Sequence, residues 1–447
     1  MDAATAISDA LVAKYDRPVP RYTSYPPANH FCPDVTARTY TDWLAQIPEG
    51  ALGSVYVHLP FCAALCRYCG CTMQVTRKND VMYNYLKALQ AEIALACKAI
   101  GHKLPLRHLH FGGGTPTHMP DDALRTLMDS LRQAFDFADD AELAIEVDPR
   151  TMTQAKARLL AELGFNRASL GVQDTDPQVQ TAIARVQPLT MVTDCVNWLR
   201  EAGIIRLNFD LIYGLPHQSV ATMRQTVADT LALRPDRISL FGYAHIPQVK
   251  KHQALLEAHP LPDAHARRTL FATATADLLA GGYTAIGIDH FALPEDSLAQ
   301  AAKDGTLRRN FQGYTDDDCP VLLGFGASAI SQLPGGYAQN VVSIKTYGET
   351  LLSGHSLPTV RGYGLSEADK AHREVIMAIM CRDTVDVPTH MLPAALPALL
   401  PLIADGLVTL TDTTLHITPR GQLFTRLVAA CFDPYTQASS KPHARAI

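Results

Sequence analysis

The sequence predicts a large α/β domain with a parallel sheet, followed by a smaller, mainly helical domain. Short apolar segments alternate with amphipathic helical segments from Ser54 to about residue 290. Because parallel strands need helical crossovers, this alternation favours a parallel sheet. Polar and glycine residues gather where the predicted strands end, which is where parallel sheets place their ligand sites. The chain has 447 residues, more than one small core requires, so a second domain is expected.

The alternation can be followed element by element. Strands are predicted at SVYVHL, RHLHF, ELAIEV, RASLGV, IRLNFDLI and RISLFGY, with a final short strand at TAIGI. Each is a short apolar run of the kind that forms a buried strand. The helices predicted between them lie at about residues 79–99, 120–135, 190–202, after Ser219, and at 263–280. This pattern fits either a barrel or a doubly wound sheet, because both place functional residues at the carboxyl ends of strands.

The flanking segments have a different composition. Near the N-terminus, PRYTSYPPANHF follows a short helical pattern, and its prolines favour an extended or turning chain. After residue 290 the alternation breaks into a loop-rich region. The tail predicts helices at 366–381, 392–405 and 419–430, with the short strands LVTL and LHIT before the last helix, a pattern typical of a winged-helix-like module.

We therefore expect four parts. Residues 1–50 form an N-terminal segment that packs over the active site, and residues 51–290 form the α/β barrel. Residues 291–364 are an extension that completes the catalytic domain, and residues 365–447 form the mainly helical C-terminal domain.

Composition and charge exclude several classes of protein. Hydrophobic residues make up 47% of the chain and charged residues 19%, as in ordinary globular proteins. A net charge of -5 gives no support to nucleic-acid binding, which needs a basic surface. The sequence contains neither the pattern of a secretory signal nor an apolar run of the ~18 residues that a membrane span needs. We expect a cytoplasmic protein, and nothing in the sequence requires more than a monomer.

Four of the ten cysteines lie within ten residues of one another: Cys62, Cys66, Cys69 and Cys71. They follow directly on SVYVHL, so they belong to a loop at the carboxyl end of a strand. Thiolates are the ligands of iron–sulfur clusters, and if only three bind, one iron keeps an open site. That site could chelate the amino and carboxylate groups of a methionine moiety. A zinc site made of the four cysteines is the alternative, although Cys69 and Cys71 are closely spaced for it.

Other predicted strand ends also carry polar or glycine residues. Residues 112–116, GGGTP, end a strand and would let the backbone approach a ligand closely, although many such turns are only sharp bends. Glu146 ends ELAIEV and could bind a cationic amino group or a ribose hydroxyl, or form a surface ion pair. Gln173, Arg185 and Asp210 are further candidates, with structural hydrogen bonding as the alternative.

The segment YVHLPFCAALCRYCGC resembles the signature of radical S-adenosylmethionine enzymes, and specifically of the oxygen-independent coproporphyrinogen III oxidase family. The resemblance continues in order along nearly the whole chain, through PRYTSYP, HFGGGTPT, IEVDPR, GVQD, NFDLIYGLP, YAHIP, DHFA, RRNFQGYT, GASAIS and YAQN. It implies a partial (β/α)6-type radical S-adenosylmethionine barrel. It also implies an oxidoreductase of porphyrin biosynthesis that converts two propionates of coproporphyrinogen III to vinyl groups, giving protoporphyrinogen IX. The chemistry would use a 5'-deoxyadenosyl radical, with an unidentified electron donor and acceptor.

The resemblance further implies the roles of individual residues. Cys62, Cys66 and Cys69 would hold a [4Fe-4S] cluster, whereas Cys71 would not be a ligand. Two molecules of S-adenosylmethionine would bind, one at the cluster and one beside it. The residues implied for the first molecule are Tyr56, Gly113, Glu146 and Ile330, and those for the second are Gly114, Thr115, Gln173, Arg185, Asp210 and Ala244.

The sequence alone leaves three points open. A haem-binding chaperone on the same scaffold is the closest alternative, but such relatives commonly have phenylalanine at the position of Cys71 and lack PRYTSYP. Tyr68 suits either adenine contact or packing of the loop. After NFQGYT, where a second threonine is usual in the family, the chain has Asp316, Asp317 and Asp318, which puts any detailed role of that loop in doubt.

Further residues are candidates for the pocket of the substrate that the resemblance implies. A guanidinium binds carboxylates in a bidentate way, so Arg21, Arg308 and Arg309 could bind those of the substrate, with a solvated basic face as the alternative. Candidates for the polar lining of the pocket are His58, Asp289 and His290, with a hydrogen-bonded core histidine as the more common alternative for a lone histidine in an apolar strand.

Overall fold

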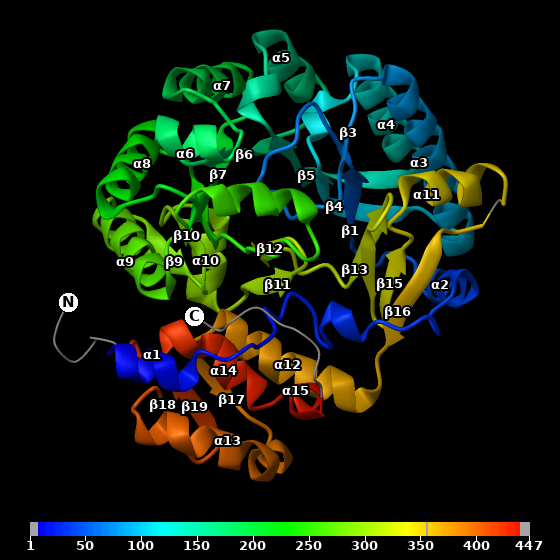
Figure 1. Ribbon diagram of the computed structural model, residues 1–447. Helices are drawn as coiled ribbons and strands as arrows, with labels where there is room; N and C mark the ends of the chain where they lie inside the picture. Colours follow the sequence, from blue (N-terminus) through cyan, green and yellow to red (C-terminus); the bar gives the residue numbers. More distant parts are fainter. Residues whose placement is uncertain (1–7, 355, 439–447) are drawn as a thin grey trace. The chain divides into compact units, whose positions relative to one another are not determined.

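The computed structural model describes residues 8–354 and 356–438 (Figure 1). The ends of the first and last predicted parts, residues 1–7 and 439–447, lie outside the described residues. The chain divides into two units. The barrel unit contains Cys32–Gly281 and Cys319–Gly364, and the helical unit contains Met1–Phe31, Gly282–Asp318 and Leu365–Ile447. The four-part division expected from the sequence stays a prediction.

The barrel unit is built on parallel strands that are hydrogen-bonded neighbours in chain order. They are β1 (Gly53–Leu59), β4 (Leu104–Gly113), β5 (Phe135–Val147), β6 (Arg167–Gln173), β7 (Arg206–Tyr213) and β8 (Arg237–Gly242). Every residue of β1 is buried except the half-buried Tyr56, as expected for a strand covered on both faces. The predicted parallel α/β fold is confirmed.

Helices follow these strands and lie around the outside of the sheet (Figure 1). They are α3 (Asn79–Ile100), α4 (Asp121–Ala134), α5 (Gln154–Glu162), α6 (Pro177–Ala182), α7 (Leu189–Glu201), α8 (Val220–Leu233) and α9 (Ala264–Ala280). Thr153, Ser219 and Asp263 cap the first turns of α5, α8 and α9 with side-chain oxygens. Helix α3 ends at Gly101, whose φ of 80° lies in the left-handed region that favours glycine.

The sheet also extends on the other side of β1. Strand β13 (Val321–Phe325) pairs in parallel with β1. It is followed by the antiparallel strands β14 (Ile330–Leu333), β15 (Gly336–Asn340) and β16 (Thr359–Gly364). Helices α2 (Ala37–Leu44) and α11 (Ile344–Leu352) belong to the same unit. The expectation of a loop-rich region is wrong here, because these strands are short and contain or adjoin glycines that mask their pattern.

A buried carboxylate connects α3 to this added part of the sheet. Glu92 is 1% exposed and accepts hydrogen bonds from Gly326 N (2.8 Å), Asn340 Nδ2 (2.6 Å) and the Tyr347 hydroxyl. Burial raises the pKa of Glu92 to about 7, against the lowering effect of these three donors. These hydrogen bonds therefore fix the turn that follows β13 to helix α3.

We expect Glu92 to make the protein less stable as the pH rises from 5 to 8. In the unfolded chain the carboxyl ionises near its ordinary pKa of 4.5, whereas in the folded protein it stays protonated up to about 7. The folded state thus binds more protons in this window, and the free energy of unfolding falls by about 3 kcal/mol across it. Urea unfolding at several pH values should show a smaller pH dependence in Glu92→Gln than in the wild type. Equal slopes would contradict this assignment.

The helical unit confirms the predicted helices and hairpin of the tail. It contains α12 (Glu367–Cys381), α13 (Leu392–Ala404), α14 (Thr425–Ala430) and α15 (Pro434–Ala438), with the strands β17 (Thr384–Asp386), β18 (Val408–Thr411) and β19 (Thr414–Ile417). The last predicted helix begins later than expected, after the short 3-10 turn Gln422–Phe424.

The N-terminal helix α1 (Asp9–Tyr15) is part of the core of this unit. The Tyr15 ring packs edge-on against Phe424, with ring centroids 5.7 Å apart, and its hydroxyl donates to Asp405 (2.6 Å). Leu11 is buried in the same cluster as the side chains of α12 and α14. Apolar burial therefore attaches α1 to the C-terminal helices of this unit.

Between these segments, the unit contains a group of small elements. Strand β9 (Thr284–Ile286), predicted as TAIGI, pairs antiparallel with β10 (His290–Ala292). Helix α10 (Ser297–Asp304) precedes the hairpin of β11 (Arg308–Asn310) and β12 (Gly313–Thr315). TAIGI is therefore half of a hairpin and does not continue the parallel alternation.

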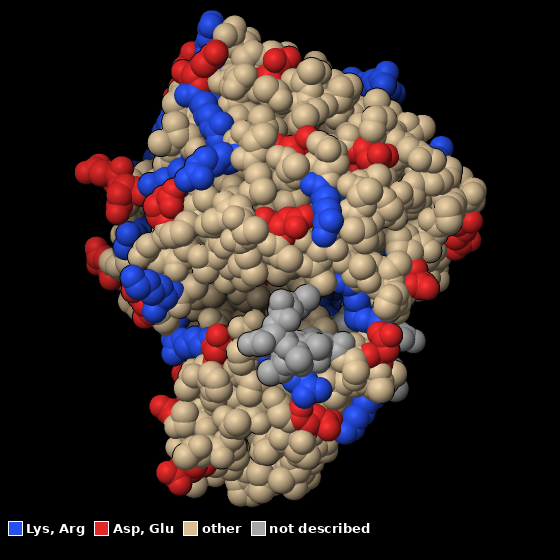
Figure 2. Space-filling model, turned by 90° about the vertical axis from the view of Figure 1, so that its left-hand side faces the viewer, with Lys and Arg blue, Asp and Glu red and all other residues tan. Residues whose placement is uncertain are grey.

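Surface charge of both signs is mixed on the face of the barrel unit in the upper part of Figure 2. Arg224 of α8 and Asp277 of α9, for example, lie 3.6 Å apart. Among the described residues, every helix falls short of the length or the apolarity that crossing a membrane would require.

Candidate functional site

The cysteines occupy the loop that follows β1. Cys62 lies in the short strand β2 (Phe61–Cys62), which pairs in parallel with β3 (Gln74–Val75). Cys62 and Cys66 are buried and Cys69 is partly buried, whereas Cys71 is exposed. The three thiols expected to bind iron thus differ in burial from the fourth.

Each of these three sulfurs has its own polar neighbours. Thr115 donates its hydroxyl to Cys62 Sγ (3.5 Å), and burial raises the pKa of the Cys62 thiol to about 11. Arg150 and Arg185 donate to Cys66 Sγ. A hydrogen bond with Cys71 holds the pKa of the Cys69 thiol below its ordinary value, and nearby positive charge adds to the effect.

A segment after β8 fastens the backbone of this loop. Lys250 Nζ donates to the carbonyl of Cys71 (2.8 Å), and Gln253 Nε2 donates to that of Tyr68 (2.9 Å). His252 Nε2 lies 2.8 Å from the carbonyl oxygen of Cys69. His252 and Gln253 belong to the 3-10 helix η5 (Lys251–Ala258). This segment was not predicted from the sequence, because nothing in KKHQ indicates that it packs against a loop about 180 residues earlier.

The described sulfurs of the cysteine loop are not gathered as a tetrahedral zinc site would need. Thiolates on a tetrahedral zinc ion lie about 3.8 Å apart, given a Zn–S distance of about 2.3 Å. In the part of the chain that the structure describes, no three of the loop cysteines have sulfurs that all lie within 4.8 Å of one another. The thiolates of an iron–sulfur cluster lie farther apart, because each binds a different iron atom. The described thiols therefore form no closed zinc site, and cysteine thiolates are the donors that an iron–sulfur cluster uses.

The glycine turn at the end of β4 lies beside the cysteine loop. Gly113 N donates to Glu146 Oε2 (3.1 Å), so two residues expected at the first S-adenosylmethionine are in direct contact. A Cβ atom on Gly112 would lie only 2.6 Å from Glu146 Oε1 and 2.9 Å from the ring of Tyr56. The structure therefore brings Tyr56, Gly113 and Glu146 together around a turn with no room for side chains.

His58 and Tyr56 form a second polar group at the end of β1. The Tyr56 hydroxyl lies 3.1 Å from His58 Nδ1, and the Tyr56 ring stacks on His110 with centroids 5.8 Å apart. His58 Nε2 lies 2.9 Å from the carbonyl of Thr72 in the cysteine loop, and burial lowers the pKa of His58. His58 therefore ties the end of β1 to the cysteine loop.

Three of the residues expected at the second S-adenosylmethionine, Gln173, Arg185 and Asp210, lie in or contact β6 and β7. Arg185 Nη2 donates to the carbonyl of Gly171 in β6 (2.7 Å), and Gln173 ends that strand with a φ of 67°. Asp210 of β7 accepts hydrogen bonds from Ser169 (3.1 Å) and Asn208 (2.9 Å). Burial raises the pKa of Asp210, and the charge of the nearby Glu146 raises it further.

Ala244 and Ile330 complete the predicted set. Ala244 follows β8 by two residues and is exposed, and Ile330 is the first residue of β14 and is half-buried. Tyr68 is partly buried and packs against an apolar cluster that includes Ile183 and Tyr243, which supports loop packing as one of its roles. The binding roles of these residues stay predictions.

Within the helical unit, four of the candidate pocket residues form one charged group. Arg21 Nη2 donates to Asp289 Oδ2 (2.7 Å), and His290 Nδ1 lies 2.7 Å from Asp289 Oδ1. The Arg309 guanidinium lies 4.3 Å from the centre of the Tyr314 ring. Burial opposes ionisation of Asp289, yet the hydrogen bond of His290 and the charges of Arg309 and Arg21 hold the pKa of that carboxyl well below its usual range.

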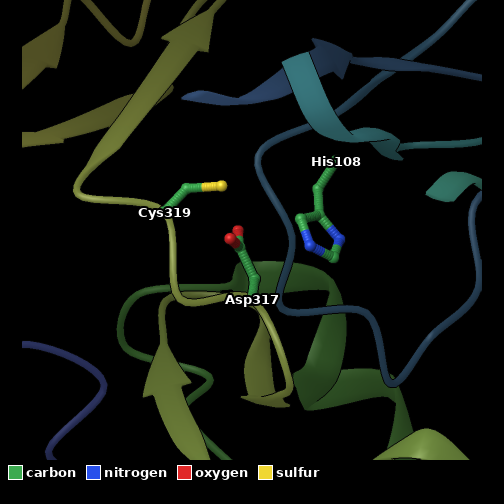
Figure 3. A group of neighbouring side chains, drawn as sticks. All are labelled: His108, Asp317 and Cys319. Atoms are coloured by element: carbon green, nitrogen blue, oxygen red, sulfur yellow. The ribbon is translucent and has the colours of Figure 1, made fainter. Parts of the chain in front are cut away.

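A further pair of possible metal ligands, His108 and Cys319, lies apart from the cysteine loop in the sequence (Figure 3). His108 of β4 and Cys319, two residues before β13, have ligating atoms within 4.8 Å of each other. Figure 3 also labels Asp317, which belongs to the helical unit. Two ligands from the barrel unit are fewer than a metal site in a protein normally uses, so we assign no metal to this pair.

Comparison with known proteins decides the family. The radical SAM superfamily model matches residues 56–230, and the HemN C-terminal domain model matches residues 365–424. The oxygen-independent coproporphyrinogen III oxidase of Bradyrhizobium diazoefficiens is 46% identical, over 98% of this chain and 100% of its own length. The chain belongs to this oxidase family. The family member of Paracoccus denitrificans is 44% identical, over 95% of this chain and 96% of its own length.

A solved structure supports the same family at the level of the fold. The coproporphyrinogen III oxidase of Escherichia coli, described as a radical SAM enzyme, superposes with a TM-score of 0.90 at 36% identity. The match covers 96% of this chain and 100% of that one. Family membership confirms the resemblance stated from the sequence, and with it a [4Fe-4S] cluster and S-adenosylmethionine as the cofactors.

Proposed function

We propose that this chain converts coproporphyrinogen III to protoporphyrinogen IX without oxygen, by oxidative decarboxylation of two propionate side chains to vinyl groups. The observation that carries the proposal is the similarity to oxidases of this activity, which are 46% and 44% identical over 98% and 95% of this chain. The cysteine loop at the carboxyl end of β1 is the structural feature that fits it. The haem-chaperone alternative receives no support from these relatives, which are named as oxidases.

The proposed ligands of the cluster are Cys62, Cys66 and Cys69. When bound, the cluster and S-adenosylmethionine supply the 5'-deoxyadenosyl radical that removes a hydrogen atom from a substrate propionate. The buried thiols and the fastened loop backbone would hold the three sulfurs in a fixed arrangement. The exposed Cys71 remains outside the ligand set.

The chain's own polar groups would bind and orient the two S-adenosylmethionine molecules. Glu146 presents a carboxylate that can accept hydrogen bonds from an ammonium group at the first site, beside the bare backbone of Gly113. The residues proposed for the second molecule are Gly114, Thr115, Gln173, Arg185, Asp210 and Ala244. Tyr56 and Ile330 complete the first site.

The proposal includes a cellular setting and reaction partners. The ten cysteines are all free thiols, which fits a reducing compartment, so we place the enzyme in the cytoplasm. An external one-electron donor must reduce the cluster, and an acceptor must take the electron that remains after decarboxylation. We expect the enzyme to work as a monomer.

An anaerobic assay tests the function directly. The reconstituted protein is incubated with dithionite, S-adenosylmethionine and coproporphyrinogen III, and the formation of protoporphyrinogen IX and 5'-deoxyadenosine is measured. Both products are expected. Absence of both would refute the proposal, whereas 5'-deoxyadenosine without the porphyrinogen product would indicate a different substrate.

A further inference from the structure

We infer that Arg150 is a positioning residue that orients Cys66 and raises the reduction potential of the cluster. The inference rests on the proposed function, because it takes Cys66 to be a ligand. Arg150 lies in the short 3-10 helix η4 (Pro149–Thr151), directly after β5. It belongs to the IEVDPR motif, in which the sequence alone indicated a role for Glu146 and for no other residue.

Arg150 contacts the sulfur through a braced guanidinium. Its Nη2 lies 3.3 Å from Cys66 Sγ and 2.7 Å from Asp148 Oδ2. Because Nη2 carries two hydrogens, it can donate to both acceptors at once. Its Nε donates to Asp148 Oδ1 (3.0 Å), which completes a bidentate pair. The carboxylate thus holds the guanidinium in the orientation that points one N–H at the sulfur.

Asp148 also accepts a single hydrogen bond from a second arginine. Arg185 Nη1 donates to Asp148 Oδ2 (3.1 Å) and to Cys66 Sγ (3.5 Å). Burial is high, since the side chains of Arg150, Asp148 and Arg185 are 19%, 8% and 7% exposed. Two buried guanidinium groups and one carboxylate leave a net charge of +1 beside one thiolate.

Of the three proposed ligands, Cys66 is the one whose sulfur accepts from guanidinium groups of the described residues, whereas Lys250 and His252 place positive charge near Cys69. Cys62 receives a neutral hydroxyl from Thr115, and the Cys69 sulfur has a neighbouring thiol. Arg185 is already expected to bind the second S-adenosylmethionine and also donates to the carbonyl of Gly171. Arg150 makes its side-chain hydrogen bonds with Asp148 and Cys66, so the sulfur is its partner outside the pair with Asp148.

The expected effect follows from charge. When one electron from a chemical reductant enters the 2+ cluster, the 1+ product is more negative by one unit. A cation and an N–H donor at a ligand sulfur stabilise the reduced form more than the oxidised form, and so raise the potential. Removing Arg150 should therefore make the cluster harder to reduce.

The test measures the midpoint potential of the reconstituted protein without S-adenosylmethionine, by redox titration followed by electron paramagnetic resonance. In Arg150→Gln we expect the equilibrium constant for reduction to fall about tenfold, a shift of ~59 mV to more negative potential. Arg150→Lys keeps the positive charge but loses the planar guanidinium that donates to Asp148 and Cys66 together. The shift of its midpoint potential should therefore be smaller than that of Arg150→Gln. Iron and sulfide content are measured in every sample.

Arg125→Gln is the matched control. Arg125 is 51% exposed, pairs with Glu162 at the surface (2.7 Å), and loses the same charge on substitution. Its midpoint should equal that of the wild type. A purely structural role for Arg150 predicts lower thermal stability with an unchanged midpoint.

Each outcome decides the matter. A loaded Arg150→Gln protein with the wild-type midpoint overturns the inference and leaves the proposed function intact. If Arg150→Gln assembles no cluster, Arg150→Lys decides, with a lower midpoint supporting the inference and a wild-type midpoint overturning it. A wild-type chain that holds no [4Fe-4S] cluster would instead refute the proposed function.

Discussion

Replacing Gly114 with alanine should leave the protein unable to hold its cluster. A Cβ atom at this position would lie 2.8 Å from Phe61 N, Phe61 O and Pro60 C, closer than real Cβ contacts come. These are backbone atoms, which cannot rotate away as a side chain would. Gly114 N also donates to Leu59 O (2.9 Å), so the glycine turn and the segment after β1 already lie close together. The added methyl must displace the backbone that leads into Cys62.

We expect the iron and sulfide content of Gly114→Ala to fall about tenfold or more, because overpacking of about 1–3 kcal/mol is concentrated at the first proposed ligand. The contact of Thr115 with Cys62 Sγ should be lost with it. Iron and sulfide analysis after anaerobic reconstitution measures the effect.

Gly70→Ala is the control for this prediction. Gly70 lies in the same cysteine loop, but a Cβ atom there meets nothing within 4 Å. This variant should bind as much iron and sulfide as the wild type. If Gly114→Ala binds as much iron and sulfide as the wild type, the backbone of Phe61 and Pro60 can shift to make room for the methyl group. That result would contradict the prediction.

The elements found from the sequence are those with a local pattern. Strand β1 is a mainly apolar, almost fully buried run, β7 alternates buried and less buried residues, and α3 has a long amphipathic period, so each could be recognised without its partners. Strand β13 was missed because it is short and contains Gly324, although it pairs in parallel with β1. Its place in the sheet is set by that pairing, about 270 residues away in the sequence.

The same distinction applies to the site. The cysteines and the glycine turn were found because each is a compact motif beside a predicted strand. Arg150 and His252 were missed as functional candidates because their partners, Cys66 and Cys69, are 84 and 183 residues away. A lone arginine or histidine carries no pattern that indicates such a contact. Only the fold shows which polar side chains reach the loop.

Replacing Cys66 with serine should remove the cluster, whereas replacing Cys71 with serine should not. A serine oxygen is a poor substitute for a thiolate at iron, and the change also leaves Arg150 and Arg185 without the sulfur to which they donate. The loss should exceed the ~10–100-fold effect typical of residues that only support a metal ligand. Iron, sulfide and the resonance signal of the reduced protein should all fall to background, and 5'-deoxyadenosine should no longer form.

Cys71→Ser makes the same chemical change five residues later in the same loop. Cys71 is exposed and its carbonyl is held by Lys250, so the loop backbone keeps its anchor when the thiol is replaced. We expect four irons and four sulfides per chain in this variant, as in the wild type. Loss of the cluster from Cys71→Ser together with its retention in Cys66→Ser would overturn the proposed ligand set. The pair therefore tests whether the buried Cys66, and not the exposed Cys71, is a ligand of the cluster.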